Sequence, residues 1–168
     1  MEYIKSFVPA TERGLLPAYL IFVSVVAMGN TFQSFSTLAY TNRIYNGLFV
    51  PNPRLPSTSM QSLTPASSKD AEKAKGQVTP LAGRLFGVYT FMAGLIRFYA
   101  AYEIENPRLY QLAIWTHIIA AAHFTSEALI YGGINSSTIF GGPPAFPFLA
   151  AYGGLFWMLS QYSNYVAA

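Results

Sequence analysis

Four apolar segments alternate with polar ones along the chain, and each has about the length of a helix that crosses a membrane. From Leu109 to Ser126 the chain has 18 residues without a formal charge, which is enough to span hydrocarbon as a helix. Charged residues are also absent from Gly14 to Asn42 and from Ala128 to the last residue. We therefore predict an all-α polytopic membrane protein, a single membrane domain over residues 1–168 with a four-helix transmembrane bundle at about 15–40, 85–102, 109–131 and 144–162.

The polar segments between these helices differ in character. Residues 41–83 contain five prolines and a Ser/Thr-rich run, a composition that predicts a flexible, disordered loop between the first two helices. The segment Glu103 to Arg108 is short and contains Pro107, which predicts a tight turn and an antiparallel hairpin. Nothing at the N-terminus resembles a removable signal peptide, so the first helix is expected to stay as an anchor.

Composition supports the membrane assignment and excludes several classes of protein. Charged residues make up 10% of the chain and hydrophobic ones 52%, with a mean hydropathy of +0.32, whereas a soluble domain carries about 25% charge. The net charge of +3 comes from basic residues spread over loops and helix ends, so no nucleic-acid surface is predicted. The absence of cysteine excludes disulfides, thiolate metal sites and cysteine catalysis.

The predicted hairpin sets a register between the second and third helices. With the turn centred between Glu105 and Asn106, Arg84 lies at the level of Glu127, and we expect an ion pair between them because an unpaired charge in a membrane is costly. Arg97 lies at the level of Trp115, whose ring offers a cation-π contact while the Arg97 stem reaches toward the turn. The alternative for Arg97 is contact with an anion or a sterol hydroxyl.

The third helix also carries both histidines of the chain. His123 and Glu127 are four residues apart and share one helix face, whereas His117 lies elsewhere around the helix. Such a set is able to ligate a metal or move a proton, but it is incomplete for either, and we expect these side chains to hydrogen-bond to neighbouring helices. No nucleophile elbow, P-loop, dinucleotide fingerprint or histidine-box series occurs, so no catalytic, cofactor-binding or metal residue is predicted.

Small and polar residues supply candidate contact surfaces between helices. Gly87 and Gly94 lie seven residues apart in the second helix, which leaves one face without bulky side chains. Asn30 and Gln33 offer hydrogen bonds from the first helix. Both features serve packing within the bundle or contact with a partner protein, and we favour packing within the bundle.

Several runs of the chain resemble the ergosterol biosynthetic protein 28 family. They are VSVVAMGNTFQSF from Val23, VTPLAGRLFGVYTFMAGLIRFYAAYEIENPRLYQLAIWT from Val78, and HFTSEALIYG from His123. The positions that match the pattern of the family are Gly29, Asn30, Gln33, Ser34, Arg84, Phe86, Gly87, Ile96, Arg97, Leu109, Tyr110, His123, Phe124, Ser126 and Glu127.

The resemblance implies a multi-pass protein of the endoplasmic reticulum membrane that takes part in sterol biosynthesis without a catalytic role or a cofactor. It implies a scaffold that tethers the sterol C-4 methyl oxidase, the C-4 decarboxylase of the 3-beta-hydroxysteroid dehydrogenase type and the 3-keto sterol reductase. A sterol C-24 methyltransferase and a second copy of the chain are further expected partners, besides membrane lipid.

Two other functions remain open at the level of sequence. One is a small intramembrane sterol-modifying enzyme, such as an isomerase, that uses His117, His123 or Glu127 as acid and base. The other is a sterol or proton conduit through the bundle. Six basic residues on the side of residues 41–83, against three on the other, favour a cytosolic position for that loop, and four helices place both termini on one side.

Overall fold

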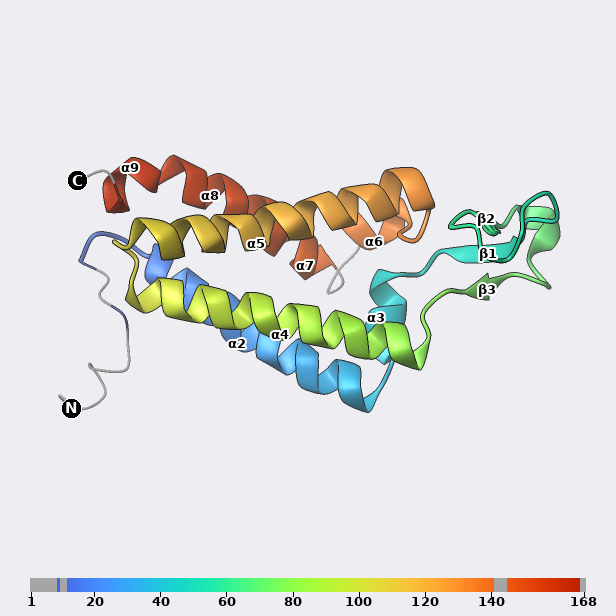
Figure 1. Cartoon of the computed structure of the whole chain (residues 1–168), viewed down its shortest axis with the longest axis horizontal. Helices are drawn as coiled ribbons and strands as arrows, with labels where there is room; N and C mark the ends of the chain where they lie inside the picture. Colours follow the sequence, from blue (N-terminus) through green and yellow to red (C-terminus); the bar gives the residue numbers. More distant parts are fainter. Residues whose placement is uncertain (1–8, 10–11, 141–144, 167–168) are drawn as a thin grey trace.

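The computed structural model describes residue 9, residues 12–140 and residues 145–166. Long helices lie side by side, and a small sheet projects from one end of them (Figure 1). Helix α2 (Leu16–Ser36) packs along α4 (Pro80–Tyr102), and α4 turns back into α5 (Pro107–Ser126). The C-terminal helices run beside α5, so that α2 begins and α9 (Tyr162–Tyr165) ends at the same end of the molecule (Figure 1).

Two of the described helices, α2 and α4, are long and apolar enough to cross a membrane. They contain 21 and 23 residues, which correspond to about 31 and 34 Å, close to the thickness of a hydrocarbon core of about 30 Å. Each starts with a proline in its first turn, where the missing amide hydrogen leaves no partner unsatisfied. Thr79 also caps α4 by accepting a hydrogen bond from the Ala82 amide.

The first predicted helix is shorter than expected. It ends at Ser36 rather than Tyr40, because Thr37 adopts an extended conformation, and a short helix α3 (Ala39–Ile44) follows. Thr37 favours this break, since its carbonyl accepts a hydrogen bond from Gln33 Nε2 and its hydroxyl accepts one from the Ala39 amide.

The predicted hairpin between the second and third helices is confirmed. Asn106 caps α5 by accepting hydrogen bonds from the amides of Arg108 and Leu109, and Pro107 is the first residue of the helix. A π-helical segment (Glu127–Tyr131) continues α5 to the predicted end of the helix. The helix ends at Gly132, whose φ of +72° is a left-handed backbone conformation that favours glycine.

The fourth predicted helix consists of several pieces. A continuous run is formed by α7 (Phe146–Phe148), a π-helical segment (Leu149–Gly153) and α8 (Gly154–Ser160), and α9 follows a bend at Gln161. The predicted start at Pro144 lies outside the described residues. A short helix α6 (Ser136–Phe140) precedes this region.

Residues 41–83 are not the disordered loop that composition predicts, and the chain is therefore not purely α-helical. Strands β1 (Leu48–Pro51), β2 (Leu63–Pro65) and β3 (Lys75–Gly76) form an antiparallel sheet in the order β2-β1-β3. A 3-10 turn (Ser68–Asp70) lies between β2 and β3. The sheet is tied to the helices because Phe49 is buried and the Gly47 amide donates to the Gly133 carbonyl at 3.0 Å.

Two groups of buried apolar side chains hold the helices together. At the end with the α4–α5 turn, Leu16 and Leu20 of α2 pack with Tyr110 of α5 and Met158 of α8. Nearer the sheet, the ring of Phe124 in α5 lies 4.7 Å from that of Phe148. These contacts join the first and last helices to the central hairpin.

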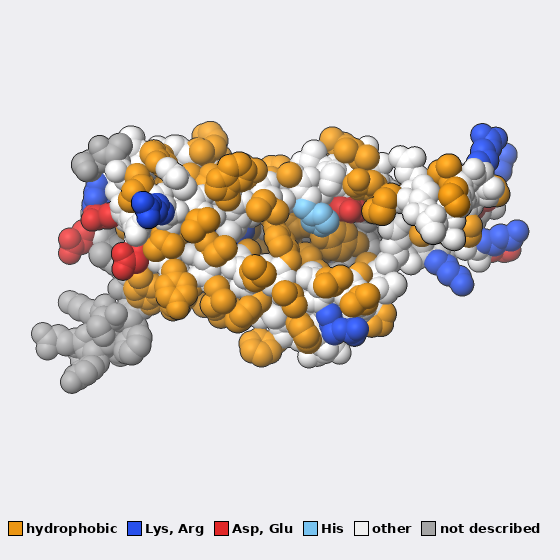
Figure 2. Space-filling model, viewed as in Figure 1, with side chains coloured by type: hydrophobic (Ala, Val, Ile, Leu, Met, Phe, Trp, Pro, Cys, Tyr) orange, Lys and Arg blue, Asp and Glu red, His pale blue; other side chains and the backbone are white. Residues whose placement is uncertain are grey.

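The outer surface of the helices is strongly apolar. Large hydrophobic side chains are exposed on every long helix, for example Phe32 at 76%, Leu129 at 80% and Phe156 at 76%. Figure 2 shows hydrophobic side chains along most of the length of the molecule, with charged side chains mostly near its two ends. This arrangement is typical of a protein surrounded by lipid between two aqueous layers.

Candidate functional site

A cleft opens between the beginning of α4 and the end of α5, on the side where α3 and the sheet begin. Its volume is about 490 Å³, within the range of ligand pockets. Figure 2 shows the hollow with histidine and carboxylate side chains at its rim and hydrophobic side chains inside. Most of its lining is apolar, and the residues that carry polar groups are Thr41, Tyr45, Gln77, Tyr89, His123 and Glu127.

Tyr45, at the end of α3, and His123, on α5, meet in this cleft. The Tyr45 hydroxyl and His123 Nε2 share a hydrogen bond of 2.7 Å. Burial, together with the nearby Glu127 carboxylate, raises the pKa of Tyr45, so the phenol remains protonated at neutral pH. Tyr45 was not among the predicted residues, because it lies in a segment without helical or strand periodicity.

Glu127 lies one turn beyond His123 and faces the same cleft, so the prediction that the two share a helix face is confirmed. Its carboxylate lies against the backbone of Gly133, where a Cβ atom would overlap it. Gly133 therefore allows the chain that returns from α5 to pass close to Glu127.

The predicted ion pair between Arg84 and Glu127 is wrong. Arg84 is exposed on α4, and within the described part of the chain no ion pair or hydrogen bond joins the two side chains. The hairpin places residues at equal depth but does not determine the direction in which each side chain points around its helix. The π-helical segment that begins at Glu127 also changes the rotation per residue at that position.

Arg97 is buried between α4 and α5, with 8% of its surface exposed. Its Nε donates to the Thr116 hydroxyl at 2.8 Å, and its Nη2 donates to the Thr116 carbonyl at 3.4 Å. Trp115 is 57% exposed and points elsewhere, so the predicted cation-π contact is wrong. Successive helical residues point about 100° apart, and Thr116 rather than Trp115 faces α4.

His117 lies deep in the bundle beside this arginine. The side chain is fully buried, its Nδ1 donates to the Ala113 carbonyl at 2.8 Å, and its Nε2 is buried without a hydrogen-bond partner. A Cβ at Gly154 would come within 2.7 Å of His117 Nε2, so this glycine lets α8 approach α5 closely. His117 is separate from the cleft that holds His123.

The glycine stripe of α4 packs within the molecule. A Cβ at Gly87 would lie 3.1 Å from the ring of Phe35, and one at Gly94 would lie 3.2 Å from Cβ of Ala27, both on α2. Asn30 Nδ2 donates to the Thr90 hydroxyl of α4 at 3.3 Å. The interpretation as packing within the bundle is therefore confirmed for this stripe, whereas Gln33 bonds locally to Thr37.

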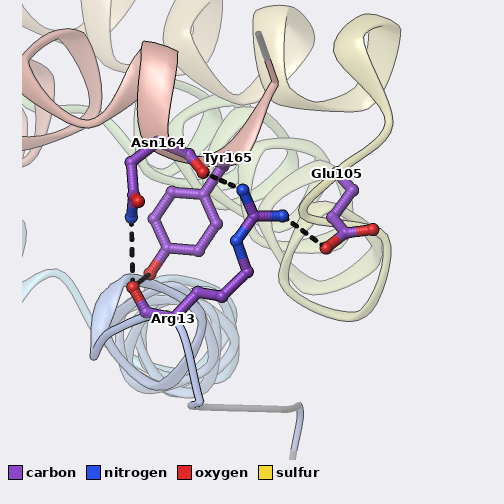
Figure 3. Close-up of polar contacts among 4 residues, drawn as sticks. All are labelled: Arg13, Glu105, Asn164 and Tyr165. Carbon is purple, nitrogen blue, oxygen red and sulfur yellow. Dashed lines mark hydrogen bonds and ion pairs between the residues drawn. The ribbon is translucent and has the colours of Figure 1, made fainter. Parts of the chain in front are cut away.

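A polar network at the opposite end of the molecule was not predicted. Arg13 Nη1 lies 2.6 Å from Glu105 Oε1 in the α4–α5 turn, and Nη2 donates to the Asn164 carbonyl near the C-terminus. Figure 3 shows the guanidinium between these two groups, with the Tyr165 hydroxyl directed at the Arg13 carbonyl. The sequence offered no signal for it, because the three segments are far apart in the chain.

No three His, Cys, Asp or Glu side chains of the described residues come together in a way that would hold a metal ion. The groups able to move a proton are the Tyr45–His123 pair and Glu127 in the cleft. Many aromatic and aliphatic side chains are exposed on the remaining helix surfaces. Chemically, the cleft offers a hydrogen-bonding group at the edge of an apolar pocket.

Comparison with known proteins gives consistent matches. Residues 16–156 match the family described as Erg28 like protein, from the first residue of α2 into α8. The chain is 40% identical to ergosterol biosynthetic protein 28 of Gibberella zeae over 99% of its own length and 98% of that protein. It is 28% identical to the protein of that name from Saccharomyces cerevisiae, over 96% and 89% of the two chains. It is also 32% identical to the Homo sapiens homolog, over 70% and 66%. No solved structure matches the chain.

Proposed function

Because the chain belongs to the Erg28 family, we propose that it is a non-catalytic membrane scaffold of ergosterol biosynthesis. In this role it tethers the sterol C-4 methyl oxidase, the C-4 decarboxylase and the 3-keto reductase to one another. The names of the relatives from Gibberella zeae and Saccharomyces cerevisiae place those proteins in ergosterol biosynthesis. A scaffold would pass intermediates between enzymes that act in succession on one apolar substrate.

The observation that carries this proposal is the apolar outer surface of the helices. On α2, Val25 and Phe32 point outward at 60% and 76% exposure, and Gly29 between them has open space in place of a neighbour. A small residue in an exposed apolar stripe admits the backbone of another membrane helix. The glycines of α4, in contrast, are already covered by α2.

The proposed topology is four membrane crossings in the endoplasmic reticulum, with residues 41–83 in the cytosol. Two described helices meet the length and hydropathy expected of a span. The hairpin returns α5 across the same thickness, and the start of α2 lies at the same end as the end of α9 (Figure 1). An even number of crossings agrees with that arrangement.

Co-purification tests the scaffold proposal directly. The tagged chain is solubilised in mild detergent and captured, and the three C-4 demethylation enzymes are measured by mass spectrometry. We expect all three to be recovered, and cells without the chain to accumulate 4-methyl sterols while each enzyme keeps its activity when assayed alone. Recovery no greater than with an unrelated multi-pass protein of the same membrane would refute the scaffold.

An intramembrane sterol-modifying enzyme is the second candidate, and the meeting of Tyr45, His123 and Glu127 in one cleft favours it. The purified chain would then convert a sterol without any partner. His123→Gln separates the two functions, because a scaffold keeps sterol flux when this variant assembles normally. Conversion of a sterol by the purified native chain, lost in an assembled His123→Gln variant, would establish the enzyme.

A further inference from the structure

The cleft between α4 and α5 has the form of a binding site that runs along the helices. Phe86 and Tyr89 line it from α4, Ile119 and His123 line it from α5, and Glu127 lines it from the π-helical segment that continues α5. Glu127 lies eight positions after Ile119, which corresponds to about 12 Å of helix rise. Phe49 of the sheet and the end of α3 close the cleft near Glu127.

Polar groups gather at one end of the cleft. Thr41, Tyr45 and Gln77 come from the segments that adjoin the sheet, and Glu127 lies at the end of α5. Ile119 lies about two turns nearer the middle of the helices than Glu127, and Phe86 and Tyr89 line the cleft from α4, where the Phe86 ring lies 5.6 Å from that of Tyr45. A molecule that fits this cleft has a polar head near the sheet and an apolar body that extends along the helices.

Two hydroxyl groups of the lining are buried without a hydrogen-bond partner. The hydroxyl of Thr41 is one of them, and only 2% of this residue is exposed. The hydroxyl of Tyr89, where the cleft adjoins a smaller cavity that reaches Arg97, is the other. Buried polar groups in native proteins normally have partners, and both of these hydroxyls belong to residues that line the cleft.

The charge of the lining selects the kind of head group. No Lys or Arg is among the described residues that line the cleft, whereas the Glu127 carboxylate is. A carboxylate repels the phosphate of a phospholipid and the carboxylate of a fatty acid, but it accepts a hydrogen bond from an alcohol. The cleft therefore fits a neutral amphiphile with a hydroxyl head.

We propose that this cleft binds a 3-hydroxy sterol, with the hydroxyl beside Thr41, Tyr45 and Glu127 and the ring system against Phe86, Tyr89 and Ile119. The proposal rests on the proposed role in ergosterol biosynthesis and deepens it, because the scaffold then holds the lipid on which its partner enzymes act. The His123–Tyr45 hydrogen bond orients the phenol at the head of the site.

Retention of tritiated ergosterol by the purified full-length chain tests the proposal. We expect saturable binding that unlabelled ergosterol displaces, and that the analogue without the 3-hydroxyl displaces about tenfold less effectively. Dioleoylphosphatidylcholine and oleate should not displace it. Displacement by the phospholipid as effective as by the sterol would show a general lipid groove and would overturn the proposal.

Ile119→Trp tests the location, with Leu112→Trp as the matched control. Both side chains are about half exposed on α5, but Ile119 lines the cleft and Leu112 does not. Ile119→Trp should weaken sterol binding by about tenfold or more, whereas Leu112→Trp should leave it within about twofold. Equal effects of the two variants would place the sterol elsewhere.

A second cleft variant tests the location independently if Ile119→Trp fails to fold. Ala82→Trp fills the cleft from α4, and Leu81→Trp is its control outside the cleft. Each variant is used only if it elutes as a single species and keeps the melting temperature of the native chain. If Ile119→Trp or Ala82→Trp loses sterol but still recovers the three enzymes, the site and the scaffold both stand. If the native chain binds no sterol yet recovers the enzymes, the site is refuted and the scaffold is not.

Discussion

Polar side chains within the helices form hydrogen bonds with neighbouring groups rather than ion pairs with opposite charges. Arg97 shows this most clearly, because both of its hydrogen bonds go to Thr116 and none of the described carboxylates pairs with it. The Thr116 hydroxyl in turn donates to the Ala113 carbonyl at 2.7 Å. One hydroxyl therefore connects the buried arginine to the backbone of α5.

Removal of that hydroxyl should destabilise the protein. Thr116→Val keeps the shape of the side chain but leaves Arg97 Nε without its acceptor, and we expect a loss of about 1–3 kcal/mol in the free energy of unfolding. Thr125→Val removes a hydroxyl of the same helix that contacts the Tyr152 hydroxyl at 2.8 Å but no charged group, and it should cost less, about 0.5–1.5 kcal/mol. Denaturant titration in detergent measures both, and similar values would show that the buried contact is not stabilising.

Asp70 gives a pH-dependent contact outside the helices. Hydrogen bonds from the Ser67 hydroxyl and amide hold the pKa of Asp70 below its ordinary value. Because the pKa is lowered on folding, the contact contributes stability above the ordinary carboxyl range and loses it as the pH falls through the lowered value.

Ser67→Ala should therefore move the pKa of Asp70 upward. Asp70 is the only aspartate of the chain, so selective ¹³C labelling gives one carboxyl signal to follow by NMR. Ser68→Ala serves as a control, since Ser68 is not among the partners of this carboxylate. An unchanged titration in Ser67→Ala would show that the turn does not form in solution.

At the scale of elements, the contact between α2 and α4 depends on small residues. Gly94 packs against Ala27, and the Thr31 hydroxyl donates to the Gly87 carbonyl at 3.1 Å. Close approach of this kind gains packing contacts that lipid cannot supply. The opposite face of α2, which contains Gly29, remains open.

Two glycine variants distinguish these faces. Gly94→Leu should force α2 away from α4 and destabilise the protein by about 1–3 kcal/mol or more, since overpacking displaces both helices. Gly29→Leu should leave the melting temperature unchanged and reduce recovery of the partner enzymes. Normal partner recovery with Gly29→Leu would mean that this face of α2 meets lipid, and normal stability with Gly94→Leu would contradict the packing described above.

At the level of the whole molecule, Arg13 joins the segment before α2 to α9 and to the α4–α5 turn. Its side chain contacts Glu105, and its carbonyl accepts hydrogen bonds from Asn164 and Tyr165 (Figure 3). The network lies at the end of the helices away from the sheet. In a membrane, the start of α2, the end of α9 and the α4–α5 turn would then face the same aqueous compartment.

Reporter fusions test this topology. Glycosylation reporters at the two termini should give the same result, and a reporter inserted between β1 and β2 should give the opposite one. A cytosolic sheet predicts modification at both termini and none at the insertion. Opposite results at the two termini would require an odd number of crossings and would refute the proposed bundle.

The long helices and the hairpin follow from local features of the sequence. Uncharged runs of sufficient length require intrahelical hydrogen bonds in lipid, and Asn106-Pro107 carries a local signal for the start of a helix. The packing of small residues could also be predicted, because it depends on the spacing of Gly87 and Gly94 along one helix.

Which side chains meet depends on how the helices pack in three dimensions. Helical periodicity gives the depth of Arg84, Arg97 and Glu127 but not the direction from which a neighbouring helix approaches, and for this reason both predicted contacts of the arginines were wrong. The sheet at residues 48–76 depends on pairing between short strands that are distant in sequence. Its Pro/Ser-rich composition is typical of a disordered loop and therefore did not predict that pairing. The Tyr45–His123 cleft depends on the same long-range contacts, because the segment that returns from the sheet to α4 closes one side of it.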